Sequence, residues 1–133
     1  MNAPSLSIHP DSAALADTAA DTLMVLAAAA IADRGRFAVA VSGGSTPKAM
    51  FQRLATPNFS SRINWPKIEV YFVDERCVPP DHPDSNFRMA HQALLAHVPI
   101  PPANIHRMRG EIDPNTAAIE YGRILKARFG DGG

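Results

Sequence analysis

Short apolar runs alternate with helical patterns along this chain. Residues 37–41 form a continuous apolar run, which is typical of a strand covered on both faces in a parallel sheet. Residues 68–73 predict a second strand, and residues 105–108 a shorter third. Before them, a first helix is expected from residue 11 or 12 to about Arg34. Helical spacing predicts its buried stripe to be Leu15, Ala19, Leu23, Leu26 and Ala30.

Start signals place three further helices between and after these strands. Thr46 and Pro47 have the residue types of a helix cap and a first helical position. Asp84 or Ser85 can cap a third helix that runs to about residue 97, and residues 113 and 114 repeat the cap-then-proline signal for a last helix.

The alternation of strands and helices predicts an α/β fold with a doubly wound, mostly parallel, Rossmann-like sheet. Ligands bind such sheets beyond the carboxyl ends of the strands, so the loops that begin at Ser42 and Asp74 are expected to meet in one crevice. The last predicted helix is followed by the Gly-Asp-Gly-Gly sequence at residues 130–133 rather than by a strand. We therefore expect the sheet to be incomplete at its carboxyl end, with one bare edge.

Composition narrows the classes of function. The 133 residues are 46% hydrophobic, which suits one domain, and 13 basic residues balance 13 acidic ones. Zero net charge argues against a nucleic-acid surface or a polybasic membrane anchor. Asp17, Asp21 and Asp33 flank and interrupt the alanine-rich amino-terminal stretch, so no membrane span and no secretory signal are expected. A single cysteine, Cys77, favours a reducing cytoplasm.

The Ser-Gly-Gly-Ser-Thr-Pro loop at residues 42–47 is the strongest local signal. Two glycines allow a sharp turn and close approach of a ligand, and free amides at the start of a helix favour an anion. The loop lacks the Gly-Lys-Ser/Thr ending of a Walker A motif. By itself the pattern is equally consistent with phosphate binding and with an ordinary strand-to-helix turn.

Charged and amide side chains follow the second predicted strand. Arg76 offers a planar fork for an oxyanion. Of the two acids, Asp74 rather than Glu75 is expected to face a crevice, because it adjoins the buried strand. Asn86 can bond a sugar hydroxyl, and Lys48 can reach a phosphate or remain solvated. The five histidines and Cys77 lack the spacing of a metal site.

Taken in order, three segments resemble the 6-phosphogluconolactonases. They are the loop at residues 42–47, the Val-Asp-Glu-Arg-Cys-Val-Pro sequence at 73–79 and the Asp-Ser-Asn sequence at 84–86. The resemblance covers the chain from about Ser12 onward. The related glucosamine-6-phosphate deaminases usually have tyrosine at the position of Arg76, so Arg76 favours the lactonase branch.

The resemblance implies hydrolysis of 6-phosphoglucono-δ-lactone to 6-phosphogluconate, in the pentose phosphate pathway, without metal or organic cofactor. It implies catalytic roles for Arg76, which would stabilise charge on the lactone oxygen, and Asp74, which would line the sugar site with Asn86. The 6-phosphate is expected on the loop formed by Ser42, Gly43, Gly44, Ser45 and Thr46.

The family's general base is a histidine in a Gly-x-Asp-Gly-His segment, and none of the five histidines here matches it. We therefore expect residues 1–133 to be the amino-terminal part of a single lactonase-type domain. Alone it should be inactive, and self-association or a complementing carboxyl-terminal segment would complete it. A non-catalytic sugar-phosphate binding module and a glucosamine-6-phosphate deaminase-like enzyme are the alternatives.

Overall fold

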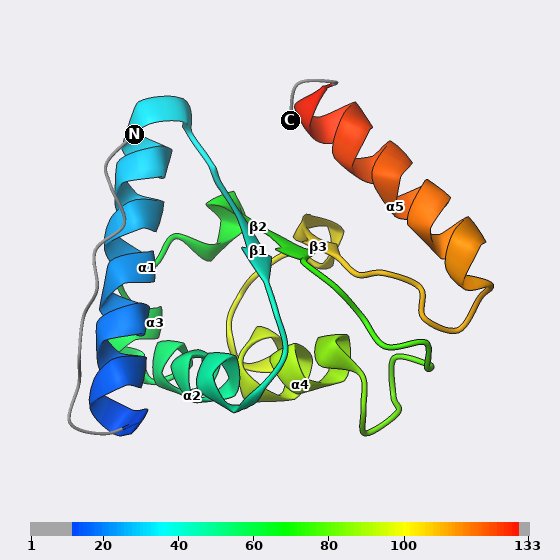
Figure 1. Cartoon of the computed structure of the whole chain (residues 1–133). Helices are drawn as coiled ribbons and strands as arrows, with labels where there is room; N and C mark the ends of the chain where they lie inside the picture. Colours follow the sequence, from blue (N-terminus) through cyan, green and yellow to red (C-terminus); the bar gives the residue numbers. More distant parts are fainter. Residues whose placement is uncertain (1–11, 131–133) are drawn as a thin grey trace.

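In the computed structural model, which describes residues 12–130, three parallel strands lie side by side among helices (Figure 1). The strands are β1 (Phe37–Val41), β2 (Ile68–Phe72) and β3 (Ile105–His106), in the order β1-β2-β3. Phe37 pairs with Ile68 and Val41 with Phe72. The predicted parallel α/β sheet is confirmed, although its third strand is two residues shorter than expected.

Five α-helices and three short 3-10 turns connect and flank the described strands. The helices are α1 (Ser12–Arg34), α2 (Ser45–Leu54), α3 (Pro57–Ser60), α4 (Asn86–Ala93) and α5 (Pro114–Phe129). The turns are η1 (Trp65–Lys67), η2 (Leu95–His97) and η3 (Pro102–Asn104).

The caps of two helices agree with the sequence, and two boundaries do not. Ser85 caps α4, and Asp113 caps α5 by accepting a hydrogen bond from the backbone N–H of Thr116 at 3.0 Å. However, α4 ends at Ala93 instead of residue 97, and α2 begins at Ser45 with Gly44 at its cap position. Gly44 has φ +108°, a backbone conformation that disfavours any residue with a side chain.

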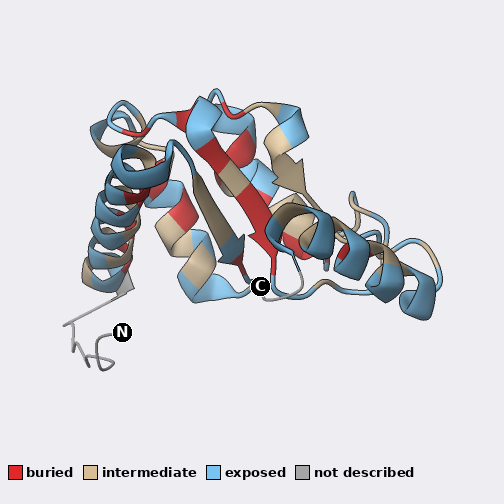
Figure 2. Cartoon of the chain, turned by 90° about the horizontal axis from the view of Figure 1, so that it is seen from above, coloured by how far each residue is buried: buried red, intermediate tan, exposed pale blue. Residues whose placement is uncertain are grey.

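The core lies against the central strand. Figure 2 shows β2 buried along most of its length. One face of the sheet packs against α1, α2 and α4 through a cluster of apolar side chains, which includes Ala20, Ala27, Val41, Phe51, Leu54, Ile68, Val70, Phe72, Ala90 and Leu94. The opposite face of β2 presents Tyr71 to Phe129 of α5, with ring centroids 5.3 Å apart. Helices on both faces confirm the doubly wound prediction.

The first helix buries a stripe that only partly matches the predicted one: Ala30 is buried and Leu23 packs half-buried against the core, as expected. Its buried residues are Ala16, Ala20, Ala27 and Ala30, whereas Leu15 and Leu26 are exposed, with Leu26 55% exposed. Because α1 is apolar on nearly every side, helical spacing does not single out one face. The small alanines let α1 lie close to α2, so close packing decides which face turns inward.

Helix α1 also meets, by length and composition alone, the criterion for a candidate membrane span. The segment Ala13–Arg34 has a mean hydropathy of 1.6, and 22% of the apolar window is buried in the structure. A core helix meets this criterion as well, so the expectation that the stretch does not span a membrane stays a prediction. In the fold, Asp17 pairs with Arg53 of α2 across 3.0 Å, which joins the two helices on the protein's surface.

Two polar contacts fasten α5 to the sheet. Arg128 donates to both carboxylate oxygens of Glu69 at 2.7 Å, and this guanidinium holds the pKa of Glu69 below its usual value. The Tyr121 hydroxyl accepts from the backbone N–H of Phe72 and donates to the carbonyl of His106, both at 2.8 Å. Tyr121 thus bridges β2 and β3 at the point where their ladder ends.

We expect Tyr121→Phe to destabilise the fold by about 1–3 kcal/mol, because it leaves a buried N–H and a carbonyl without their partner. The free energy of unfolding in urea measures this loss. Ile119→Ala on the same helix is the control, since Ile119 is 58% exposed and should change stability by less than about 0.5 kcal/mol. Equal stabilities of Tyr121→Phe and the wild type would contradict the bridging role.

Candidate active site

The predicted phosphate loop leaves β1 at Val41 and enters α2 at Ser45. The first amides of a helix have no partner within it, so the N–H groups of Ser45 and Thr46 are available to a ligand. Pro47 has no N–H, and the first helical bond runs from the N–H of Lys48 to the carbonyl of Gly44 at 3.1 Å. Ser42, Ser45 and Thr46 are exposed, so their hydroxyls are accessible at this edge.

Asn86 joins this loop to the loop that follows β2. Its side-chain amide donates to the carboxylate of Asp74 at 3.1 Å and to the carbonyl of Asp74 at 3.3 Å. The side-chain oxygen of Asn86, Oδ1, lies against Gly43, where an added Cβ atom would come within 2.1 Å of it. Asn86 is only 7% exposed. The structure therefore confirms that the two loops meet, and they meet across one buried amide.

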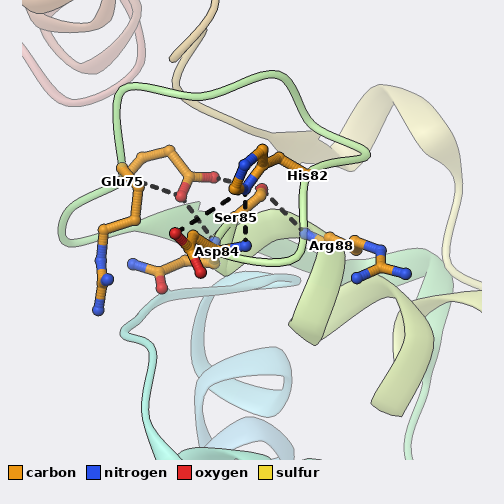
Figure 3. A network of polar contacts seen from close by, with 7 residues as sticks. Glu75, His82, Asp84, Ser85 and Arg88 are labelled. Atoms are coloured by element: carbon orange, nitrogen blue, oxygen red, sulfur yellow. Dashed lines mark hydrogen bonds and ion pairs between the residues drawn. The ribbon is translucent and has the colours of Figure 1, made fainter.

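Glu75, which the sequence did not single out, occupies the amino terminus of α4. One carboxylate oxygen accepts from the N–H groups of Arg76 at 2.8 Å and Asn86 at 2.6 Å. The other accepts from the Ser85 hydroxyl and the N–H of Phe87, both at 3.0 Å. Figure 3 shows this network, with the Ser85 hydroxyl in turn accepting from the N–H of Arg88. Helix α4 has no acid in its own first turn, so Glu75 supplies the negative charge there.

No local pattern identifies Glu75 as this ligand. Ten residues separate it from Ser85, and the intervening loop has neither helix nor strand. A cap read from the sequence considers only neighbouring residues, whereas this carboxylate reaches the helix through the tertiary fold. The prediction that Asp74 rather than Glu75 faces the site is consistent with the direction of the Glu75 carboxylate, toward α4.

Arg76 is exposed, and its guanidinium forms no hydrogen bond or ion pair with the residues from 12 to 130. It lines a cavity of about 160 Å³ together with Cys77, Met108 and Ile112. The backbone of Arg76 is closely covered, because a Cβ atom on Gly110 would lie 2.2 Å from its carbonyl oxygen. The segment before α5 therefore packs against the Arg76 backbone, while the Arg76 side chain is exposed.

Lys48 lies apart from these contacts, beside a cavity of about 370 Å³ between α2 and α4 that it lines with Gln52, Arg88 and Gln92. Among the described residues, no three His, Cys, Asp or Glu side chains gather in a way that could hold a metal ion. The absence of a cofactor stays a prediction.

Comparison with known proteins identifies the family of this chain. The model of the family described as glucosamine-6-phosphate isomerases/6-phosphogluconolactonase matches residues 10–132. The chain belongs to this family. A 6-phosphogluconolactonase of Nostoc sp. is 39% identical over 125 residues, which cover 93% of this chain and 50% of the relative. One of Synechocystis sp. is 46% identical over 101 residues, or 75% of this chain and 40% of the relative.

Solved structures of the family have the same fold. A structure described as devB protein superposes with a TM-score of 0.82 at 31% identity, covering 91% of this chain and 49% of that one. The 6-phosphogluconolactonase of Trypanosoma cruzi gives a TM-score of 0.80 at 25% identity, with 96% and 52% covered. The chain spans about half the length, or less, of these relatives.

We expect Gly43→Ala to push the Asn86 side chain away from Asp74, because the added methyl group overlaps it. The loss of these hydrogen bonds should lower the free energy of unfolding by about 1–2 kcal/mol. Gly122→Ala is the matched control: nothing lies within 4 Å of a Cβ there, and alanine within α5 should stabilise by about 0.5–1 kcal/mol.

Asn86→Ala removes the overlapping atoms, so Gly43→Ala should cost less in that background. An undiminished cost in the double variant would show that Gly43 is required for some other reason.

Proposed function

We propose that the protein carrying this chain hydrolyses 6-phosphoglucono-δ-lactone to 6-phosphogluconate. Family membership supports the reaction class, since the relatives from Nostoc and Synechocystis are named 6-phosphogluconolactonase. The observation that carries the proposal within this chain is the bridge formed by Asn86. It brings the glycine loop and the Asp74–Arg76 segment to one edge of the sheet.

The two helix starts at this edge differ, and the difference supports phosphate binding on α2. Glu75 and Ser85 already satisfy the first amides of α4, whereas the amides of Ser45 and Thr46 on α2 are open. Gly44 allows the turn, and Gly43 leaves room for the Asn86 side chain beside the loop. We therefore place the 6-phosphate on the residues Ser42, Gly43, Gly44, Ser45 and Thr46.

In the proposed reaction, water attacks the lactone carbonyl, and the bond between that carbon and the ring oxygen breaks. One proton of the water goes to the ring oxygen, which becomes a hydroxyl. The other is released through the base to solvent, and the carbonyl carbon becomes the carboxylate. Arg76 has a free guanidinium that can stabilise the tetrahedral oxyanion. Asp74 and Asn86, held together at 3.1 Å, would orient the sugar hydroxyls.

The general base is proposed to be a histidine from another segment. All four histidine rings among the described residues already have a partner. His106 stacks on Tyr71 at 4.6 Å and His91 on Phe87 at 5.5 Å. The His82 ring accepts from the N–H of Asp84 at 3.0 Å, and His97 Nε2 lies 2.8 Å from the carbonyl oxygen of Gln92. Among the described strands, β1 and β3 each pair on one side only, so both outer edges of the sheet are open. We propose that a complementing carboxyl-terminal segment pairs with one of these edges, with self-association as the alternative.

The cytoplasm remains the expected compartment. One relative from Arabidopsis thaliana is named chloroplastic, so family membership does not fix the compartment.

With the complementing segment present, Arg76→Ala should lower kcat/KM for the lactone by about 10²–10³, the usual effect of removing one oxyanion donor. Proton release from the lactone, corrected for spontaneous opening, measures the rate. Arg123→Ala removes an equal charge from an exposed site on α5 and should leave the rate within twofold of the wild type. A similar result for Arg76→Ala would remove Arg76 from the mechanism.

A non-catalytic sugar-phosphate binding module is the second candidate. Two observations favour it: the first amides of α2 are open, and the described histidine rings already contact other residues. Under either candidate, calorimetry should show tighter binding of 6-phosphogluconate than of gluconate, because the loop recognises the phosphate. Equal binding of both ligands would contradict the phosphate site. Binding without lactone opening would favour the module, and ammonia release from glucosamine 6-phosphate would favour the deaminase alternative.

A further inference from the structure

Glu75 has a role that the reaction outlined above does not use. Its side chain is half-buried, and its carboxylate accepts four hydrogen bonds, two on each oxygen. Four is close to the full accepting capacity of a carboxylate. It therefore has no capacity left for a substrate, and its contacts all lie within the protein.

These four bonds join two segments that carry proposed site residues. The N–H groups of Arg76 and Asn86 share one oxygen of Glu75, at 2.8 and 2.6 Å. The side chain of Asn86 then returns to the other neighbour of Glu75, Asp74, at 3.1 Å. The Glu75 carboxylate thus bonds to the backbones of Arg76 and Asn86, and Asp74 is joined to them through the Asn86 side chain.

The buried cap residue holds this carboxylate in place. Ser85 is 2% exposed, donates its hydroxyl to Glu75 and accepts from the N–H of Arg88 at 3.2 Å. The positive end of the α4 dipole favours a carboxylate over a neutral amide at this point. Substitution of Glu75 by glutamine would place an NH₂ group against backbone donors and loosen the attachment of the loop to the helix.

We infer that Glu75 is a positioning residue, which fixes Arg76 relative to Asn86 and so aligns the oxyanion donor with the bound sugar. This inference rests on the proposed lactone hydrolysis. A displacement of about 1 Å in a positioned group can reduce a rate by about 10²-fold. Glu75 touches neither substrate nor reacting atoms, so its effect on the reaction must pass through Arg76 and Asn86.

The test is a double-mutant cycle on kcat, measured with the complementing segment present. Glu75→Gln should lower kcat by about 10–100-fold and raise KM less. In the Arg76→Ala background the same change should lower kcat by less than about threefold, because the residue to be positioned is gone. If Glu75→Gln does not fold, Ser85→Ala is the substitute variant. It removes one of the four donors to Glu75 and should lower kcat by a smaller factor.

Glu69→Gln is the control: it removes structural hydrogen bonds of a glutamate that does not bond to Arg76 or Asn86. Glu69 is likewise a glutamate with several hydrogen bonds, from Arg128 and Tyr71, but it lies within β2. It should lower the melting temperature and leave kcat within twofold of the wild type.

Three results would overturn the inference. One is a kcat of Glu75→Gln within twofold of the wild type, and another is an equal loss of kcat in both Arg76 backgrounds. The third is unchanged amide hydrogen exchange of Asn86 and Phe87 in Glu75→Gln. A wild-type protein that does not open the lactone would instead refute the proposed function, and the inference with it, so the two failures are distinguishable.

Discussion

The parallel pairing of β1 with β2 is the constraint on which the site depends. With Val41 aligned to Phe72, both strands end at the same edge of the sheet, and the N–H of Val73 continues the ladder to the carbonyl of Val41 at 2.9 Å. The glycine loop and the Asp74 loop therefore leave the sheet side by side. Antiparallel pairing would place them at opposite ends, and Asn86 would have nothing to bridge.

Two helix starts present their first amides at this edge, and the described residues satisfy those of only one of them. Those of α4 bond to the Glu75 carboxylate and the Ser85 hydroxyl. Those of α2 lie beside glycines and exposed hydroxyls, without a protein carboxylate. The first amides of α4 have protein partners and those of α2 do not. We therefore propose that α2 binds the phosphate and that the start of α4 has a structural role.

The two faces of the sheet are covered by different means. The face toward α1, α2 and α4 is a continuous apolar cluster, in which small alanines of α1 permit close packing. On the other face, α5 is fixed largely by directed bonds, the Glu69–Arg128 pair and the Tyr121 bridge. The Tyr121 bridge lies at the end of β2, from which the Asp74 loop departs.

The sequence by itself determined the order of the strands and the longer helices, the caps of α4 and α5 and the position of the glycine loop, because these depend on neighbouring residues. Its three motifs also sufficed for the family. It did not determine the buried face of α1, since an all-round apolar helix has no marked stripe until a neighbour packs on it. Nor did it show the role of Glu75 or Tyr121. Each bonds to backbone N–H groups that only the tertiary fold brings near, 11 positions away for Glu75 and Asn86 and 49 for Tyr121 and Phe72.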